Sequence, residues 1–192
     1  NYYALLNCGL NMVPTAGTAN GVHPVPLGFG RVYVEQPDGF SYENWVNGLK
    51  NGRSFVTTGP MVFATLNGKS VGEWFDSTGR FNATIEGEIL SEKPLSFAEI
   101  IHNGQPVHTI MGRNQRTDTG AYRTIFQIEI PVSESGWLAV RAWEDRSGGR
   151  VRFAHTAPWH IHIPGKPLKP TIEERQYLID RVELEIARSR EL

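Results

Sequence analysis

The chain has 192 residues, of which 40% are hydrophobic and 20% charged, a composition typical of a globular protein with a sizeable core. Nineteen basic and twenty acidic side chains leave a formal charge of -1, and no run of Lys or Arg predicts a nucleic-acid-binding surface. The apolar runs are far shorter than a bilayer-spanning helix requires. We therefore expect neither nucleic acid nor a membrane as a partner.

The single cysteine, Cys8, excludes an internal disulfide and a zinc–cysteine cluster. It fits a reducing compartment, and it fits equally a secreted protein without disulfides. The chain begins at Asn1 with neither a methionine nor a signal peptide. We expect either that processing has removed an upstream segment or that the sequence is part of a longer protein.

Residues 1–13 predict a short helix, because their apolar side chains recur with helical spacing. No residue caps the start, as though the helix were entered from a preceding segment. A loop rich in proline and glycine follows at 14–26, with the sequence PTAGTANGVHPVP. Residues 31–35, RVYVE, alternate as a strand does. The apolar stripe of the helix consists of Tyr3, Leu6 and Leu10.

Residues 40–52, FSYENWVNGLKNG, predict a second helix with clear end signals. Ser41 is a suitable N-cap and Glu43 lies in the first turn. Lys50 in the last turn and Gly52 after it favour the end of the helix at this point. We expect a buried face made of Trp45, Val46 and Leu49.

From about residue 54 the chain consists of short β-type segments between turn signals, among them the hairpin signal Asn103-Gly104. This spacing predicts a mainly β fold with about eight strands, packed as an immunoglobulin-like antiparallel β-sandwich. Two of these segments show the clearest alternation between the two faces of a strand. Their predicted core-facing residues are Tyr122, Thr124, Phe126, Ile128 and Ile130 in YRTIFQIEI, and Leu138, Val140 and Ala142 in WLAVRAWE, opposite Trp137, Arg141 and Trp143.

A proline-rich link at 164–170 separates the sandwich from a last predicted helix. Thr171 and Glu174 have the spacing of a capping box, in which each side chain bonds the other's backbone amide. The apolar residues of this helix form one stripe, so we expect the helix to dock against something. The stripe consists of Ile172, Ile179, Val182 and Ile186.

Paired histidines two residues apart, His160 and His162, suggest a metal site at first sight. Strand alternation argues against it, because Trp159, Ile161 and Ile163 occupy the other face and leave the histidines on the solvated one. Pro158 and Pro164 bracket the segment and favour an edge strand. We interpret the two histidines as surface residues rather than ligands.

The remaining aromatic and histidine residues also have ordinary explanations. His102 and His108 flank the predicted hairpin and would face each other if the register allows, whereas His155 fits a hydrogen-bonded core histidine. The tryptophans could form a sugar-stacking platform, but in a sandwich of this size they more often fill the core. They are Trp45, Trp74, Trp137, Trp143 and Trp159.

No serine-hydrolase, zincin or phosphate-loop motif occurs in the sequence. In the loop 14–26, His23 is a candidate metal ligand, but a catalytic metal needs about three protein ligands. Asn20 could add a weak oxygen ligand, and Glu35 and Asp38 are close in sequence but follow a predicted strand. These local observations favour a structural loop.

The first part of the chain resembles a known family. The stretch YYALLNCGLNMVPTAGTANGVHPVPLGFGRVYV, with FSYENWVNGLKNGRSFVTTGPMV and LNGKSVGE, is similar to the C-terminal portion of CehA/McbA-type metallohydrolases. These belong to the PHP (polymerase and histidinol phosphatase) superfamily. The resemblance is specific over about residues 1–75. Beyond them it consists of the order of β segments, AHTAPW and a terminal helix.

The resemblance implies that the N-terminal region is the end of a distorted β/α barrel that binds divalent metals. The family's last metal motif reads Gly-Ser/Thr-Asp, followed soon by histidine. Gly17 and Thr18 match it, Ala19 stands where the aspartate is expected, and the histidine appears at His23. His23 is therefore the one position that carries over as a metal ligand, and the other ligands would lie upstream of Asn1.

These observations predict three parts: residues 1–54 as the C-terminal remnant of a PHP-type barrel, 55–168 as the β-sandwich and 169–192 as a docking helix. The resemblance implies an accessory region of a metal-dependent hydrolase, with the upstream barrel of the same polypeptide as its partner. Zinc or manganese would be the cofactor of the whole protein. We expect the isolated chain to be inactive, to bind no metal tightly, and to self-associate as a homo-oligomer through exposed apolar surface.

Two alternatives stay open at this point. The first is a non-catalytic binding module whose exposed aromatic residues recognise glycan or protein, since a sandwich is a common binding scaffold. The second is a degenerate PHP descendant with a structural role, which Ala19 would fit.

Overall fold

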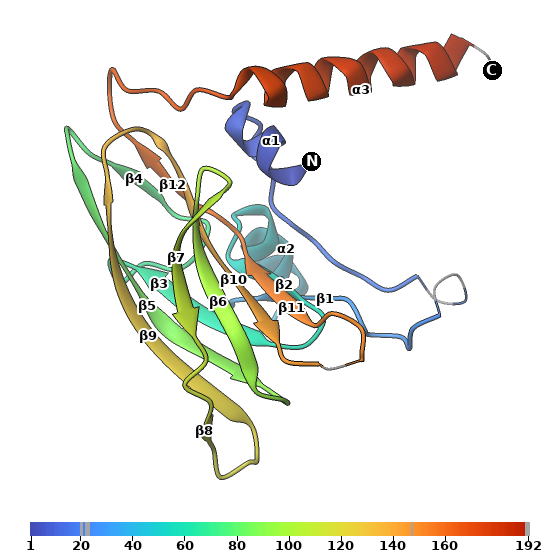
Figure 1. Ribbon diagram of the computed structural model, residues 1–192, viewed down its shortest axis with the longest axis vertical. Coiled ribbons are helices and arrows are strands. Elements are labelled where there is room, and N and C mark those ends of the chain that lie inside the picture. The colour runs from blue at the N-terminus through green and yellow to red at the C-terminus, as the bar shows by residue number, and fades with distance from the viewer. Residues whose placement is uncertain (20, 22–23, 147, 191–192) are drawn as a thin grey trace.

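The computed structural model describes residues 1–19, 21, 24–146 and 148–190, and in this part of the chain it has three helices and twelve strands (Figure 1). The protein is mainly β, with two sheets packed face to face and a C-terminal helix, as the sequence predicted. The elements are α1 (Tyr2–Asn7), β1 (Arg31–Val34), α2 (Tyr42–Lys50), β2 (Ser54–Thr57), β3 (Met61–Leu66), β4 (Trp74–Asp76), β5 (Phe81–Ser91), β6 (Leu95–His102), β7 (Gln105–Met111), β8 (Gln115–Arg116), β9 (Tyr122–Val132), β10 (Gly136–Glu144), β11 (Phe153–Thr156), β12 (Trp159–His162) and α3 (Ile172–Arg190).

The larger sheet has eight strands and the smaller one four. In the larger sheet the order is β1-β2-β11-β10-β12-β4, with β6 on the other side of β10 and β7 beyond β6. The smaller sheet has the order β3-β5-β9-β8. Since β1 pairs with β2, residues 31–34 of the predicted barrel remnant extend the sheet of the sandwich.

One strand pairing differs from the prediction. β12 pairs with β10 on one side and with β4 on the other, and the β12–β4 pairing is parallel. The predicted edge position of β12 is therefore wrong. Pro158 and Pro164 lie just outside the strand, so neither removes a hydrogen bond from its ladders. The strand beside it, β4, is only three residues long and gave no recognisable pattern.

The main core lies between the two sheets and follows the predicted alternation. In β9 the buried residues alternate with exposed ones, and in β10 the predicted inner residues belong to the same core. This alternation confirms the core-facing set in both strands. Among the largest side chains without exposed surface are Leu66, Ile85, Ile100, Leu138 and Trp159.

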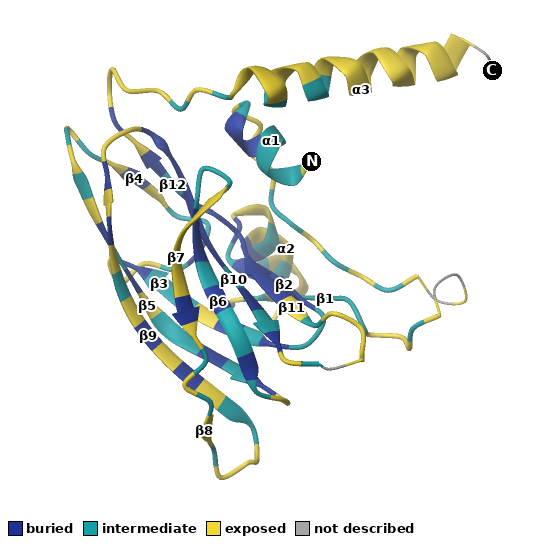
Figure 2. Ribbon diagram, in the orientation of Figure 1, coloured by how far each residue is buried: buried dark blue, intermediate teal, exposed yellow. Residues whose placement is uncertain are grey.

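β10 is also buried on its outer face, where α1 covers it. Trp137 and Ala139 form a second apolar cluster with Leu6 of α1 and Ile101 of β6. The buried amide of Asn7 fastens the helix to the sheet. Its Oδ1 accepts the indole N–H of Trp137 at 2.7 Å, and its Nδ2 donates to the Asn103 carbonyl at 3.0 Å. On the outer face of β10, Trp137 and Ala139 are therefore buried, whereas Arg141 and Trp143 are partly exposed (Figure 2).

α1 is shorter than predicted. It ends at Asn7, and Gly9 has a φ of +82°, the left-handed conformation that commonly terminates a helix. Leu10 consequently lies outside the helix and is 49% exposed. The sequence contained this stop signal, but the apolar spacing that continues to Leu10 concealed it.

α2 begins as predicted, with the Ser41 side chain accepting the Asn44 N–H at 3.0 Å. The predicted buried face is right only in part: Trp45 and Leu49 are half-buried, but Val46 is exposed and the buried residue is Gly48. A Cβ on Gly48 would lie 2.5 Å from a methyl group of Val34, so the helix rests on β1 through its own backbone. Close packing through a glycine leaves no apolar periodicity in the sequence.

α3 has the predicted capping box, with Thr171 N bonded to Glu174 Oε2 at 2.9 Å and Glu174 N to Thr171 Oγ1 at 3.1 Å. Its apolar stripe is exposed, Val182 by 59%, and α3 contributes no buried residue (Figure 2). Its main contact is with α1. The expected docking partner is thus not a described part of this chain. Among the described helices, none is both long and apolar enough to cross a membrane.

Candidate functional site

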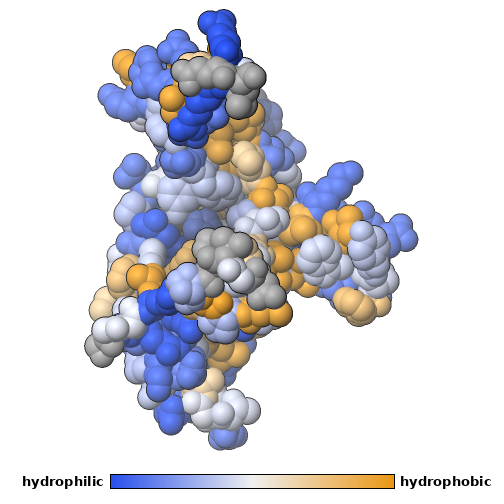
Figure 3. All heavy atoms as spheres, turned by 90° about the vertical axis from the view of Figure 1, so that its right-hand side faces the viewer, coloured by the Kyte–Doolittle hydropathy of each residue, from blue (hydrophilic) through white to orange (hydrophobic). Residues whose placement is uncertain are grey.

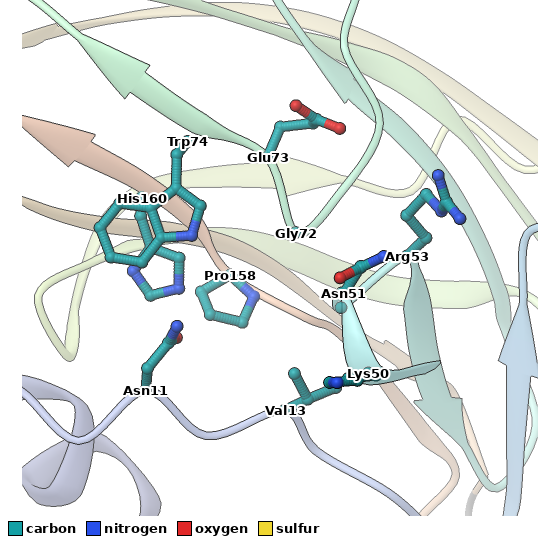
Figure 4. Close-up of a pocket in the computed structure, with 11 residues that line it drawn as sticks. Asn11, Val13, Lys50, Asn51, Arg53, Gly72, Glu73, Trp74, Pro158 and His160 are labelled. Atoms are coloured by element: carbon teal, nitrogen blue, oxygen red, sulfur yellow. The ribbon is translucent and has the colours of Figure 1, made fainter. Parts of the chain in front are cut away.

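A polar cavity of about 330 Å³ lies where the segment after α1 and the end of α2 meet the sandwich (Figure 4). We call it the seam cavity. It is formed by parts of the chain that are far apart in sequence: the segment after α1, the corner between α2 and β2, the start of β4 and the turn before β12. The lining residues that matter for its chemistry are Asn11, Lys50, Asn51, Arg53, Trp74 and His160.

Two glycines let the walls of the seam cavity approach each other. Gly52 ends α2 with a φ of +73°, and Gly72 precedes β4 with a φ of +86°. A Cβ on Gly72 would collide with the Asn51 carbonyl oxygen, and a Cβ on Gly52 would lie 3.1 Å from Gly72 Cα. Only glycine allows this backbone contact. It places the polar end of α2 beside Trp74.

An aromatic pair forms one wall of the cavity. The parallel register of β12 and β4 sets His160 opposite Trp74, and their rings stack at 4.2 Å with an interplanar angle of 13°. Trp74 is nevertheless 55% exposed. Burial lowers the pKa of His160 to about 4, so its imidazole is neutral at pH 7. Figure 4 shows Asn11 pointing toward this pair.

The cavity has more positive than negative charge. Among the described residues, neither Lys50 nor Arg53 has a carboxylate within ion-pair distance. The Nε of Arg53 is buried and has no hydrogen-bond partner in this part of the chain. The amides of Asn11 and Asn51 add further donors and acceptors. The seam cavity is therefore suited to a ligand that has acceptor oxygens and a flat or ring-shaped part.

The structure separates the two histidines of the HIH segment. His162 is exposed and its Nδ1 lies 2.9 Å from Asp76 Oδ1, as expected of a surface residue. His160 is half-buried under Trp74, so the prediction that it is fully solvated was wrong. No pattern in the sequence indicated Trp74 as its cover, because a strand of three residues is too short to predict. The described residues contain no group of three potential metal ligands.

The predicted metal loop is described only in part. His23 and Asn20 lie outside the described residues. Glu35 and Asp38 are exposed, and no described metal-ligating group includes them. The described start of the loop is held in place by Thr18, whose Oγ1 accepts the Gly30 N–H at 2.8 Å.

The other histidines and tryptophans lie mostly where ordinary packing predicts. His155 is buried and fully hydrogen-bonded, as expected of a core histidine. His102 pairs with Gln105 rather than with His108, so those two histidines do not face each other across the hairpin. Trp137 and Trp159 are core residues and Trp45 and Trp143 are half-buried, which leaves Trp74 as the exposed tryptophan.

The described residues that line the seam cavity are suited to binding a polar ligand. Lys50, Arg53 and Glu73 are its charged residues, and its histidine is neutral and stacked under an indole ring. Comparison of the chain with protein-family models, curated proteins and solved structures gave no match.

Proposed function

We propose that this chain is the C-terminal accessory region of a PHP-like metal-dependent hydrolase, in which the sandwich frames the substrate. The observation that carries the proposal is the composition of the seam cavity. Asn11 and Val13, which lead into the predicted metal loop, line the same cavity as Trp74 and His160 of the sandwich. A substrate held there would contact both the sandwich and the segment that enters the loop.

The described residues do not by themselves fit a metal centre, since no three potential ligands come together among them. His23 and ligands of the upstream barrel would have to hold the zinc or manganese. The metal would supply an activated water nucleophile. The part of the present residues is to bind and orient: Lys50 and Arg53 attract acceptor oxygens, and Trp74 offers a rigid flat surface.

Metal analysis of the purified chain tests whether the metal ligands lie mainly outside this chain. We expect less than one equivalent of zinc or manganese after dialysis, and the same amount in His23→Ala. One tightly bound equivalent that His23→Ala removes would contradict the proposal, because the chain would then possess its own centre.

Kinetics of the longer polypeptide test the framing role. We expect metal-dependent hydrolysis in which Trp74→Ala raises KM and leaves kcat nearly unchanged, since the indole is proposed to bind and not to react. Phe40→Ala is the matched control, because Phe40 is an 87% exposed aromatic residue that does not line the cavity. An unchanged KM in Trp74→Ala would show that the seam cavity does not bind the substrate.

A non-catalytic binding module is the second candidate, and the exposed but rigidly stacked Trp74 favours it. Sugars commonly stack on such indoles, and Asn11 and Asn51, which line the same cavity, offer amide groups to sugar hydroxyls. Glycan-array binding that persists in EDTA, falls in Trp74→Ala and is kept in Phe40→Ala would support this candidate over the hydrolase region.

A further inference from the structure

A second polar cavity, of about 340 Å³, lies at one end of the sandwich. It is formed by the segment before β1, the turn after β2, the turn between β5 and β6, and the segment after β10. Loops held by a rigid pair of sheets are frequent binding positions. We call it the arginine cavity, because its charged lining residues are Arg31, Arg146, Arg152, Glu92 and Glu144. It shares no lining residue with the seam cavity.

Both carboxylates of the arginine cavity are bound to one arginine. Arg146 donates from Nε to Glu144 at 2.8 Å and from Nη2 to Glu92 at 2.7 Å. The Glu144 side chain has no exposed surface and also accepts the Glu92 N–H at 3.1 Å. This network neutralises Arg146 and fixes one wall of the cavity.

The other two arginines form no ion pair with a described carboxylate. Within the described part of the chain, neither Arg31 nor Arg152 has a carboxylate within ion-pair distance. Arg152 donates to the Thr58 carbonyl at 2.6 Å, and its guanidinium lies 4.3 Å above the Phe29 ring, which fixes its position.

Arg31 is the less satisfied of the two. Its Nε is buried and has no hydrogen-bond partner among the described residues. A buried donor that is left unpaired is costly, and more so when it is charged. Two guanidinium groups that form no ion pair within the described part of the chain therefore line one cavity, and the two carboxylates of that cavity are held by Arg146.

We propose that the arginine cavity is a binding site for a small phosphate-bearing ligand, held between Arg31 and Arg152. The guanidinium fork matches the oxygens of a phosphate and forms paired, charge-assisted hydrogen bonds with it. With three arginines against two glutamates the cavity has one net positive charge, which favours an anion; a bound phosphate monoanion would neutralise it and a dianion would bring it to −1. The proposal is independent of the hydrolase role and of the seam cavity.

Calorimetric titration of the purified chain with inorganic phosphate, at constant ionic strength, tests the site. We expect one saturable site in the natural protein. Arg31→Gln and Arg152→Gln each weaken it at least tenfold, since each removes one of the two guanidinium groups. Arg31→Lys keeps the charge but loses the fork, so it weakens binding less than Arg31→Gln. Arg80→Gln is the matched control, because Arg80 is exposed, lies outside this cavity and carries the same charge.

Circular dichroism and thermal midpoints establish whether each variant is folded. If Arg31→Gln does not fold, Arg31→Lys replaces it in the test. Three results would overturn the proposal. Binding of phosphate that never saturates is one, and equal weakening by Arg80→Gln is the second, because it would reveal a general charge effect. The third is acetate competing as well as phosphate, which would make this a carboxylate site.

Discussion

At the scale of single residues, His155 shows how a titratable group is accommodated in this fold. Its Nε2 lies 2.8 Å from the Tyr3 hydroxyl and its Nδ1 lies 2.7 Å from the Thr156 carbonyl. The carbonyl can only accept, so Nδ1 carries the proton and Nε2 accepts the hydrogen bond from Tyr3. Arg141 extends the chain, bonding the Tyr3 oxygen at 3.3 Å and Glu99 at 2.8 Å. Protonation of Nε2 would remove the hydrogen bond that Tyr3 donates to it and would force the Tyr3 hydroxyl to turn away.

This arrangement predicts a loss of stability in mild acid. Burial is the main cause that lowers the pKa of His155 to about 4, whereas the unfolded chain takes up the proton near pH 6.5. The contribution of His155 to the free energy of unfolding is therefore complete above pH 6.5 and decreases as the pH falls toward 4. We expect the titration of His155 to lower the free energy of unfolding by about 2 kcal/mol between pH 7 and pH 5. Urea unfolding at the two pH values measures it.

The matched variants isolate this effect from those of other histidines. His155→Gln removes the titration, so its free energy of unfolding should change less between pH 7 and 5 than that of the natural protein. His162→Gln, at an exposed histidine, should keep the full dependence. If the His155→Gln protein has the same pH dependence as the natural one, the residue does not titrate as described.

At the scale of elements, α1 is attached to the sheet by the buried amide of Asn7 as well as by its apolar face. Asn7→Ala would leave the buried indole N–H of Trp137 unpaired and would also remove the bonds to Asn103 and Glu174. We expect a loss of about 1–3 kcal/mol in the free energy of unfolding, measured with urea. Asn82→Ala, on an exposed position of β5, should change it by less than about 0.5 kcal/mol. Equal effects in both variants would contradict the role of Asn7.

α3 leads to a prediction about association. It and α1 line an apolar groove of about 660 Å³ that includes Leu5, Val182 and Ile186, and Figure 3 shows hydrophobic atoms below the helix. We expect sedimentation velocity to show a mass that increases with concentration, because exposed apolar patches of this kind promote association. Ile186→Lys should abolish the increase without lowering the thermal midpoint, since Ile186 is not buried. Leu184→Lys, outside the groove, should associate normally.

Patterns that depend on neighbouring residues predicted the elements well. The alternation of β9, the Ser41 cap and the Thr171–Glu174 box all depend on contacts within one segment, and all three agree with the structure. β4 has only three residues, too few for a periodicity. Its parallel pairing with β12 joins residues more than eighty positions apart, and no local pattern specifies that partner.

The candidate site was less predictable than the fold. The seam cavity depends on the contact of Gly52 with Gly72, and both glycines have ordinary turn explanations in the sequence. Nothing in the sequence around Trp74 distinguishes a platform residue from a core tryptophan. What distinguishes it is the half-buried His160 that lies under it, a contact between two sheet neighbours.

At the scale of the whole molecule, the sandwich does not depend on the last helix. α3 buries no residue, and beyond its apolar contact with α1 it contributes the bond between Glu174 and Asn7. A chain that ends at residue 168 should therefore unfold cooperatively, with a thermal midpoint lower by about 2–4 °C, which corresponds to a loss of about 1 kcal/mol. Differential scanning calorimetry measures this. A broad transition or a much larger decrease would show that α3 is part of the folded core.

Strand β10 is buried on both of its faces, whereas β4 lies at a sheet edge. We therefore expect the backbone amides of these two strands to exchange with deuterium at very different rates. The amides of β10 lie between β6 on one side and β11 and β12 on the other, with apolar side chains packed on both faces, so they should exchange with deuterium only when the whole protein unfolds. β4, a three-residue edge strand, should exchange through local opening. A ligand in the seam cavity would hold Trp74 in place. It would slow exchange in β4 and leave β10 unaffected, so that deuterium uptake locates the bound ligand without any knowledge of what it is.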